Sequence, residues 1–274
     1  MTFTSNPQFR VGDVIGQSFQ TTWRNIVPFG ILAIIAAAIM FVIYTLVSSI
    51  FGLSVMPMEP GMMEPGVAAP EIGAGFFIGF LVFELLALAV YLGFMTAITY
   101  GTFQDLRGNA VGIGTLIQSS IALVGPAITT FLLVIGIFLV AAIVAAILQF
   151  IPIIGQIATV VMFVFLYIIF WVVIPVAVIE RPGPVASLKR SVALTEGHRW
   201  KILGIFLLVI AISIAAMIVA MIFNFLGLVV GMIVLAVLYA ALGIFTAVLV
   251  AVGYYKLRAT KEGADLGDIA RVFD

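Results

Sequence analysis

The sequence contains no cysteine and a single histidine, His198, in 274 residues. The absence of cysteine excludes disulfide bonds and thiolate metal sites, and one imidazole alone cannot supply a histidine-based metal centre. Charge is scarce as well, because Asp, Glu, Lys and Arg together make up 9% of the chain. We also recognise no pairing of a nucleophile with a base and no phosphate-binding glycine loop. The sequence therefore predicts a protein that is not an enzyme and has no cofactor.

Hydrophobic residues account for 64% of the chain, and the mean hydropathy is +1.34. A soluble domain with a polar surface does not reach these values. The predicted fold class is all-α, a polytopic bundle of six transmembrane helices. The expected spans are about 27–53, 73–101, 121–149, 154–179, 201–224 and 228–254. We expect residues 1–26 to form a cytoplasmic segment with an interfacial helix, 27–255 the transmembrane domain, and 256–274 a cytoplasmic tail.

The twelve Lys and Arg residues lie in four clusters, separated by residues 25–106, 108–180 and 202–255, which contain none. A bilayer-spanning helix needs roughly 20 apolar residues, so each cation-free stretch has room for two spans and a turn. The chain then returns to the side that it left, and every cation lies on one side of the membrane. The positive-inside rule predicts that both termini are cytoplasmic. The composition favours a bacterial inner membrane.

A short amphipathic stretch precedes each odd-numbered span. In the first, apolar side chains recur at helical spacing from Ile15 to Ile26, and similar stretches cover about 113–120 and 184–196. The pairs that take corresponding places in them are Gln17-Ser18, Gln118-Ser119 and Arg190-Ser191. The match predicts three repeats of an interfacial helix followed by a transmembrane hairpin. The alternative is that any helix entering a bilayer at a shallow angle looks amphipathic.

One part of the chain resembles a known family. It contains Glu180-Arg181-Pro182, then the run from Ala186 to Ser191 and the run from Gly197 to Gly204, and the pattern extends to Phe19 to Asn25. A proline-containing span ends in an acidic residue, an amphipathic helix carries an Arg-Ser pair, and a basic-aromatic group opens the next span. This arrangement resembles the glycerophosphodiester phosphodiesterase membrane-domain family and related six-span bacterial proteins. The resemblance implies an architecture only, because the chemistry of that family belongs to a separate soluble domain, for which we expect no room here.

Basic and aromatic residues at the ends of the predicted spans are the candidates for binding lipid headgroups. They are Trp23, Arg24, Arg181, Lys189, Arg190, Arg199, Trp200 and Lys201. Each basic residue near an anionic leaflet contributes about 1 kcal/mol, and Trp favours the membrane–water interface. We expect anionic phospholipids as partners, bound either by general anchoring or in a specific headgroup pocket. A membrane-protein partner stays open, and nucleic acid is not expected.

Glu84 is predicted to lie near the middle of the second span. A charged, unpaired carboxylate there would cost roughly 2.5–3.5 kcal/mol. One interpretation is a protonated Glu84 that hydrogen-bonds to hydroxyl groups of other helices, and the other is a proton or cation site. The principal prediction is a non-enzymatic inner-membrane module that interacts with lipid or with a partner. The alternative is a small transporter or permease that uses Glu84.

The first outer loop is predicted to contain four closely spaced methionines, Met56, Met58, Met62 and Met63. Thioether sulfur suits Cu(I), so the loop is a candidate copper-capture site. The favoured interpretation is a flexible, proline-interrupted loop of repetitive composition, because no cysteine or histidine lies nearby.

Overall fold

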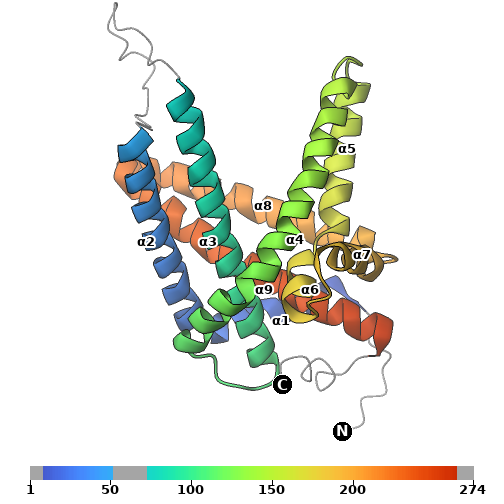
Figure 1. The fold of residues 1–274 in the computed structure, drawn as a ribbon. Helices are drawn as coiled ribbons and strands as arrows, with labels where there is room; N and C mark the ends of the chain where they lie inside the picture. The colour runs from blue at the N-terminus through green and yellow to red at the C-terminus, as the bar shows by residue number, and fades with distance from the viewer. Residues whose placement is uncertain (1–8, 52–72, 264–274) are drawn as a thin grey trace, which may run out of the picture. The chain divides into compact units, whose positions relative to one another are not determined.

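The computed structural model describes residues 9–51 and 73–263, and in these residues the secondary structure is entirely helical (Figure 1). The elements are α1 Val11–Arg24, α2 Ile26–Phe51, α3 Ala74–Leu106, α4 Ile113–Leu148, α5 Ile154–Ile169, α6 Val173–Ile179, α7 Pro184–Thr195, α8 Arg199–Phe223, the 3₁₀ turn η1 Asn224–Leu226 and α9 Leu228–Glu262. The all-α prediction is confirmed. The chain divides into two compact units, a larger one of Met1–Ala33 with Gly93–Asp274 and a smaller one of Ile34–Leu92.

Six helical segments are long and apolar enough to cross a membrane. They are Ile26–Phe51, Ala74–Leu106, Ile113–Leu148, Ile154–Ile179, Arg199–Leu226 and Leu228–Glu262. The six-span prediction is therefore confirmed, and by helix length and composition the chain is a multi-pass membrane protein. Several helices run beyond the predicted spans, because polar residues at a span end continue the same helix. The ends of all six spans that carry the basic clusters belong to the larger unit.

Two of the three expected amphipathic helices are separate elements, α1 and α7. The stretch 113–120 instead forms the first turns of α4, which continues into the span without a break. The difference follows from the residues that end each helix. The non-helical Asn25 ends α1, and Gly197 with a φ of 79° follows α7, whereas no such residue follows Ser120. The threefold repeat stays a prediction.

The fourth span is broken between α5 and α6. Pro175 has no N–H to donate to the carbonyl of Trp171, and its ring crowds the preceding turn. The buried hydroxyl of Ser191 in α7 donates to the carbonyl oxygen of Ile169, at 2.8 Å, and so satisfies one carbonyl at the break. Trp171 lies so close to α9 that a Cβ on Gly253 would come within 2.3 Å of its ring. The break is thus supported by both α7 and α9.

A small apolar core joins α4, α6 and α7 in the larger unit. Its buried members are Val134, Val173 and Leu188, with Ile137, Phe138, Phe170 and Ile174 packed around them. Elsewhere in this unit α8 forms a hairpin with α9, and α1 lies against both of them. This packing holds the C-terminal end of α6 beside α7 and α9. The functional candidates described below lie at that end.

The smaller unit consists of the C-terminal part of α2 and the N-terminal part of α3. A Cβ on Gly79 would come within 2.4 Å of the Cβ of Phe51, so the two helices approach closely there. Further along, the rings of Tyr44 and Phe83 meet edge to face at 6.1 Å. Close approach at a glycine is a common device for packing helices in membranes.

Candidate functional site

Helix α1 buries its small and polar face and exposes its aromatic face. Val14, Ser18 and Thr21 are fully buried, whereas Phe19 and Trp23 are 61% and 70% exposed. The two exposed rings stack on each other with centroids 6.4 Å apart. In water this orientation would be unfavourable, because large apolar surface would stay solvated. It is the orientation expected of a helix whose aromatic face lies in the interfacial layer of a bilayer.

The eight candidates for headgroup binding differ in exposure and in contacts. Arg190 and Arg199 are half-buried, and the other six are exposed, Trp200 to 83%. Five of the six basic residues contact the protein: Arg24 forms an ion pair with Asp105, Arg190 pairs with acidic residues, the guanidinium of Arg199 lies 5.3 Å from the ring centroid of Phe165, Lys201 Nζ donates to the carbonyl of Phe9 at 2.8 Å, and Arg181 Nε donates to the carbonyl of Val178 at 3.4 Å. These contacts contribute to helix packing.

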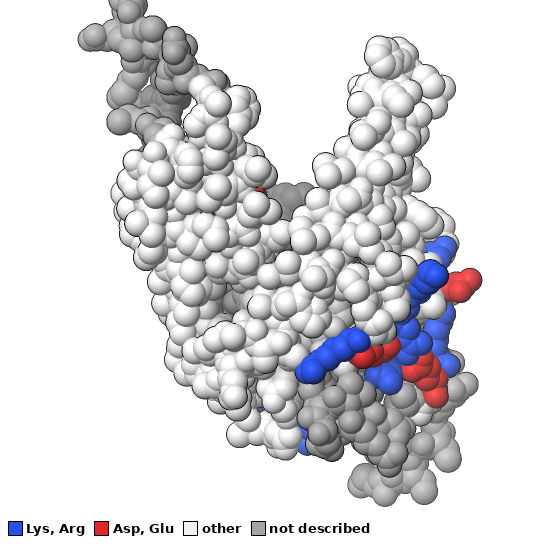
Figure 2. All heavy atoms as spheres, viewed as in Figure 1, with Lys and Arg blue, Asp and Glu red and all other residues white. Residues whose placement is uncertain are grey.

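Five side chains from the end of α6, from α7 and from α9 form what we call the ionic cluster. Its members are Glu180, Arg190, Tyr254, Arg258 and Glu262. Glu180 accepts hydrogen bonds from Arg190 Nε at 2.9 Å and from Tyr254 Oη at 2.7 Å. Glu262 pairs with both Arg190 and Arg258. Two carboxylates thus balance two guanidinium groups, and acidic and basic atoms gather around α7 and the end of α9 (Figure 2).

The cluster has a clear electrostatic effect on Arg190. Burial lowers the pKa of this guanidinium, but hydrogen bonds and charge from Glu180 and Glu262 outweigh burial and raise the pKa above its ordinary value. Arg190 is therefore permanently charged, and its guanidinium is paired with the carboxylates of Glu180 and Glu262. The members from α9 are not among the site residues predicted from the sequence, although Tyr254, Arg258 and Glu262 recur every four residues and so lie on one helix face.

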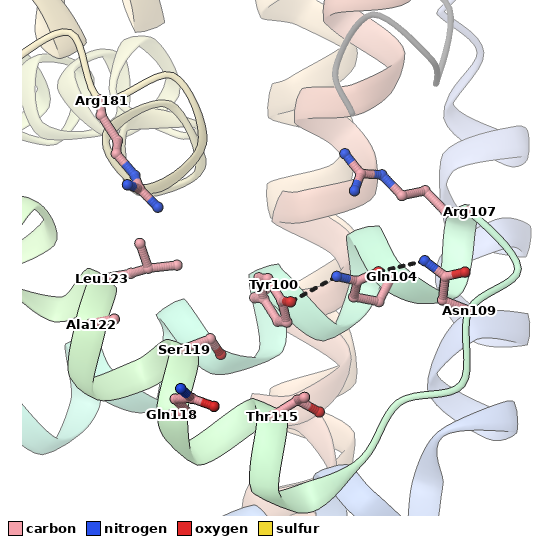
Figure 3. Close-up of a pocket in the computed structure, with 10 residues that line it drawn as sticks. All are labelled: Tyr100, Gln104, Arg107, Asn109, Thr115, Gln118, Ser119, Ala122, Leu123 and Arg181. Atoms are coloured by element: carbon pink, nitrogen blue, oxygen red, sulfur yellow. Dashed lines mark hydrogen bonds between the residues drawn. The ribbon is translucent and has the colours of Figure 1, made fainter. Parts of the chain in front are cut away.

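A second polar feature of the larger unit is a pocket of about 480 Å³, which we call the arginine pocket (Figure 3). It is lined by Tyr100, Gln104, Arg107, Asn109, Thr115, Gln118, Ser119, Ala122, Leu123 and Arg181. These residues come from the end of α3, the connection to α4, the first turns of α4, and the connection between α6 and α7. Of the described residues that line it, two are basic and none is acidic.

Hydrogen bonds fix one wall of the arginine pocket. Gln104 Nε2 donates to Tyr100 Oη at 2.7 Å, and Asn109 Nδ2 donates to Gln104 Oε1 at 2.8 Å (Figure 3). On the α4 wall, the hydroxyl groups of Thr115 and Ser119 donate to backbone carbonyls of their own helix. The amide side chain of Gln118 is exposed. The amide and guanidinium N–H groups are therefore the donors that this pocket offers.

Arg181 reaches the pocket from an unusual backbone conformation. Its φ is 49°, in the left-handed region that favours glycine. The residue lies between Glu180, which belongs to the ionic cluster, and Pro182. The sequence analysis named Arg181 as a headgroup candidate but not Arg107, and no local pattern joins these residues because they lie on different connections.

The remaining predicted sites are not joined to these features. Glu84 lies in α3 within the smaller unit, is exposed, and makes no hydrogen bond or ion pair with other described residues. The four methionines proposed to capture copper lie outside the described residues, as does most of the predicted tail. Over the part of the chain that the structure describes, no group of three or more His, Cys, Asp or Glu residues is arranged to hold a metal ion.

Comparisons of the chain with protein-family models, with curated proteins and with solved structures find no match. The resemblance to the glycerophosphodiester phosphodiesterase membrane-domain family therefore stays a prediction.

Proposed function

We propose that this protein is a non-enzymatic module of the bacterial inner membrane whose cytoplasmic, charged end binds anionic phospholipid headgroups. The observation that carries the proposal is the orientation of α1, which exposes the stacked Phe19 and Trp23 and buries Ser18. An exposed aromatic face gains free energy only where it meets the bilayer interface. The charged end of the larger unit would then lie at the level of the headgroups.

The exposed members of the headgroup set support this placement. Trp200 opens α8 and is exposed, as Trp23 is near the end of α1. The exposed cations Arg181 and Lys189 lie on the connection before α7 and on α7 itself. Aromatic rings beside cations at the ends of spans are typical of anchors that hold a protein at a defined depth.

The three tryptophans allow a direct test of depth. Variants that keep one tryptophan each and carry Phe at the other two positions would be placed in vesicles containing lipids brominated either near the glycerol backbone or near the chain ends. We expect Trp23 to be quenched more by the shallow bromines, because it lies at the interface. The variant that keeps Trp171 is the matched control, since this ring is buried. Quenching of Trp23 that does not exceed that of Trp171 would contradict the proposal.

Orientation is tested by cysteine labelling, which the absence of natural cysteine makes simple. A Gly61→Cys variant should react with a membrane-impermeant maleimide added to the periplasmic side. A Lys189→Cys variant should react only after the membrane is opened, because Lys189 is exposed and the proposed topology puts it on the cytoplasmic side. The reverse pattern would overturn the proposed topology.

The transporter alternative is favoured by one observation, the exposed carboxyl group of Glu84 on α3 without a partner among the described residues. A Glu84→Gln variant keeps the size of the side chain and removes its ability to ionise. Loss of ion-driven uptake in proteoliposomes, with unchanged thermal stability, would favour the transporter over the lipid-binding module.

A further inference from the structure

We propose that the arginine pocket is a binding site for a phosphate group, carried either by a lipid headgroup or by a small soluble phosphate compound. The inference rests on the proposed function for its location, because it needs this end of the larger unit to lie at the headgroup level. It goes further by naming one pocket, its ligand chemistry and the residues that determine both.

The charge of the pocket is the first argument. Arg107 and Arg181 reach it from two different connections, and no acidic residue is among the described residues that line it (Figure 3). The acidic residues closest to them in sequence are engaged elsewhere. Asp105 pairs with Arg24, and Glu180 is held by Arg190 and Tyr254 in the ionic cluster. The described lining therefore brings two guanidinium groups and no carboxylate to one cavity.

The available hydrogen-bonding groups are the second argument. The hydroxyl protons of Thr115 and Ser119 are already given to backbone carbonyls, and Arg181 Nε donates to the carbonyl of Val178 at 3.4 Å. The donors offered to a ligand therefore include the other N–H groups of Arg181 and the exposed amide of Gln118. Such donors suit a ligand rich in acceptor oxygens, and guanidinium groups form paired hydrogen bonds with phosphate. An ammonium group such as that of choline would find no carboxylate among the described residues that line the pocket. The pocket should therefore favour anionic phosphate groups over zwitterionic ones.

The backbone of Arg181 is the third argument. Glycine or asparagine adopts a φ of 49° at little cost, whereas a longer side chain such as that of arginine is strained there. From this conformation the Arg181 side chain lines the pocket, while the preceding residue, Glu180, belongs to the ionic cluster. A conformational cost retained at a pocket is typical of a side chain with a binding role.

The size of the pocket agrees with this ligand class. Its volume of about 480 Å³ lies within the range of roughly 300–1,000 Å³ typical of small-molecule sites. It therefore has room for a phosphate group together with the first atoms of its ester.

The test is binding of defined ligands to the full chain in detergent, measured by native mass spectrometry and by titration. The ligands are short-chain phosphatidic acid, short-chain phosphatidylcholine and inorganic phosphate. We expect phosphatidic acid to bind at least about tenfold more tightly than phosphatidylcholine, since one lost charge-assisted hydrogen bond corresponds to about that factor. Tight binding of inorganic phosphate alone would identify a soluble phosphate compound as the source. Binding that requires the lipid would identify a headgroup.

Two substitutions test the pocket itself. Arg181→Gln removes one guanidinium, and Gln118→Glu places a negative charge at the exposed wall without touching an arginine. Each should weaken binding of phosphatidic acid by about tenfold or more, while Arg181→Lys should recover part of the loss. Lys189→Gln is the matched control, because this exposed cation on α7 does not line the pocket, and it should change binding less than about twofold.

The outcomes separate the two proposals. If Lys189→Gln weakens binding as much as Arg181→Gln, the headgroups meet a diffuse positive surface, and the pocket proposal is wrong while the proposed function survives. Unchanged binding in both pocket variants leads to the same conclusion. If none of the ligands binds the natural protein, the pocket proposal is also wrong. Failure of the tryptophan depth test, in contrast, would remove the proposed function and leave only soluble phosphate as a ligand.

Discussion

Glu180 and Arg181 are neighbours in the sequence and lie in opposite kinds of environment. Glu180 belongs to the ionic cluster, where its carboxylate accepts hydrogen bonds from two helices and its charge is balanced. Arg181 is exposed and contributes to a pocket in which no described lining residue is acidic. Arg181 has a left-handed backbone conformation at this point, where one side chain joins the cluster and the next lines the pocket.

The difference shows that charges at the same end of the membrane spans serve two purposes. In the ionic cluster, opposite charges are paired and join α7 to α6 and α9. In the arginine pocket, two guanidinium groups reach one cavity, and none of the described residues that line it is acidic. Substitutions in the cluster should therefore change stability, and substitutions in the pocket should change binding.

The largest loss of stability is expected for Glu180→Gln. This change removes one of the two carboxylates that pair with the partly buried Arg190, which costs about 2–3 kcal/mol. Thermal unfolding in detergent, followed by circular dichroism, should show a clearly lower midpoint. Glu196→Gln is the control, because this exposed acid at the end of α7 forms none of the described salt bridges. Equal midpoints for the two variants would show that Glu180 in the ionic cluster contributes no more to stability than an exposed acidic residue.

A smaller effect is expected for Tyr254→Phe. It removes the hydroxyl that donates to Glu180 and accepts from Arg258 Nη1 at 3.2 Å, but keeps the ring that meets Phe103 edge to face at 5.9 Å. We expect a loss of about 1–2 kcal/mol, typical of two hydrogen bonds near the surface. In the double variant with Glu180→Gln the two losses should not add, since both break the same contact. Additive losses would show that the tyrosine acts independently of the cluster.

Unlike the two substitutions in the ionic cluster, Arg181→Gly should not lower the stability of the protein. Glycine adopts the left-handed conformation without steric cost, so the free energy of unfolding should stay the same or rise by about 0.5–1 kcal/mol. The same variant should lose binding of phosphatidic acid. A large loss of stability would instead place Arg181 with the structural residues of the cluster.

The smallest change in stability is expected from protonation of His198, whose ring meets Phe9 edge to face at 5.3 Å. Burial lowers the pKa of His198, and the charges of Lys201 and Lys261 lower it further. Because the folded protein binds this proton less readily than the unfolded chain, stability should be full above the ordinary histidine pKa of about 6.5 and should fall as the pH drops below it. Thermal midpoints measured from pH 7.5 down to 5.5 should show this slope, and His198→Gln should flatten it. If the slope of the midpoint against pH is unchanged in the His198→Gln variant, titratable groups other than His198 cause it.

The sequence predicted the spans because apolar length and cation spacing are local properties. It placed all six, and it predicted amphipathic helices at α1 and α7. It did not predict that the stretch 113–120 would join α4, because helix ends depend on single residues such as Asn25 and Gly197. Apolar residues continue through the fourth span, so their pattern does not reveal the break before Pro175, where Ser191 donates to the carbonyl of Ile169.

The candidate site was less predictable than the fold. Arg190 was assigned to lipid headgroups because it lies in the densest basic cluster, but tertiary packing brings it between Glu180 and Glu262. The arginine pocket depends on the approach of two connections that are far apart in the sequence. Periodicity and composition describe single helices, so neither can place Arg107 and Arg181 at one cavity.

The helix pair α6 and α7 has a mechanical consequence. Adjacent residues of α7 hold both ends of α6, since Ser191 binds the carbonyl of Ile169 before it and Arg190 binds the carboxylate of Glu180 after it. The short helix is therefore tied to α7 at both ends. A displacement of α7 would be passed to the break at Trp171, which lies against Gly253 of α9.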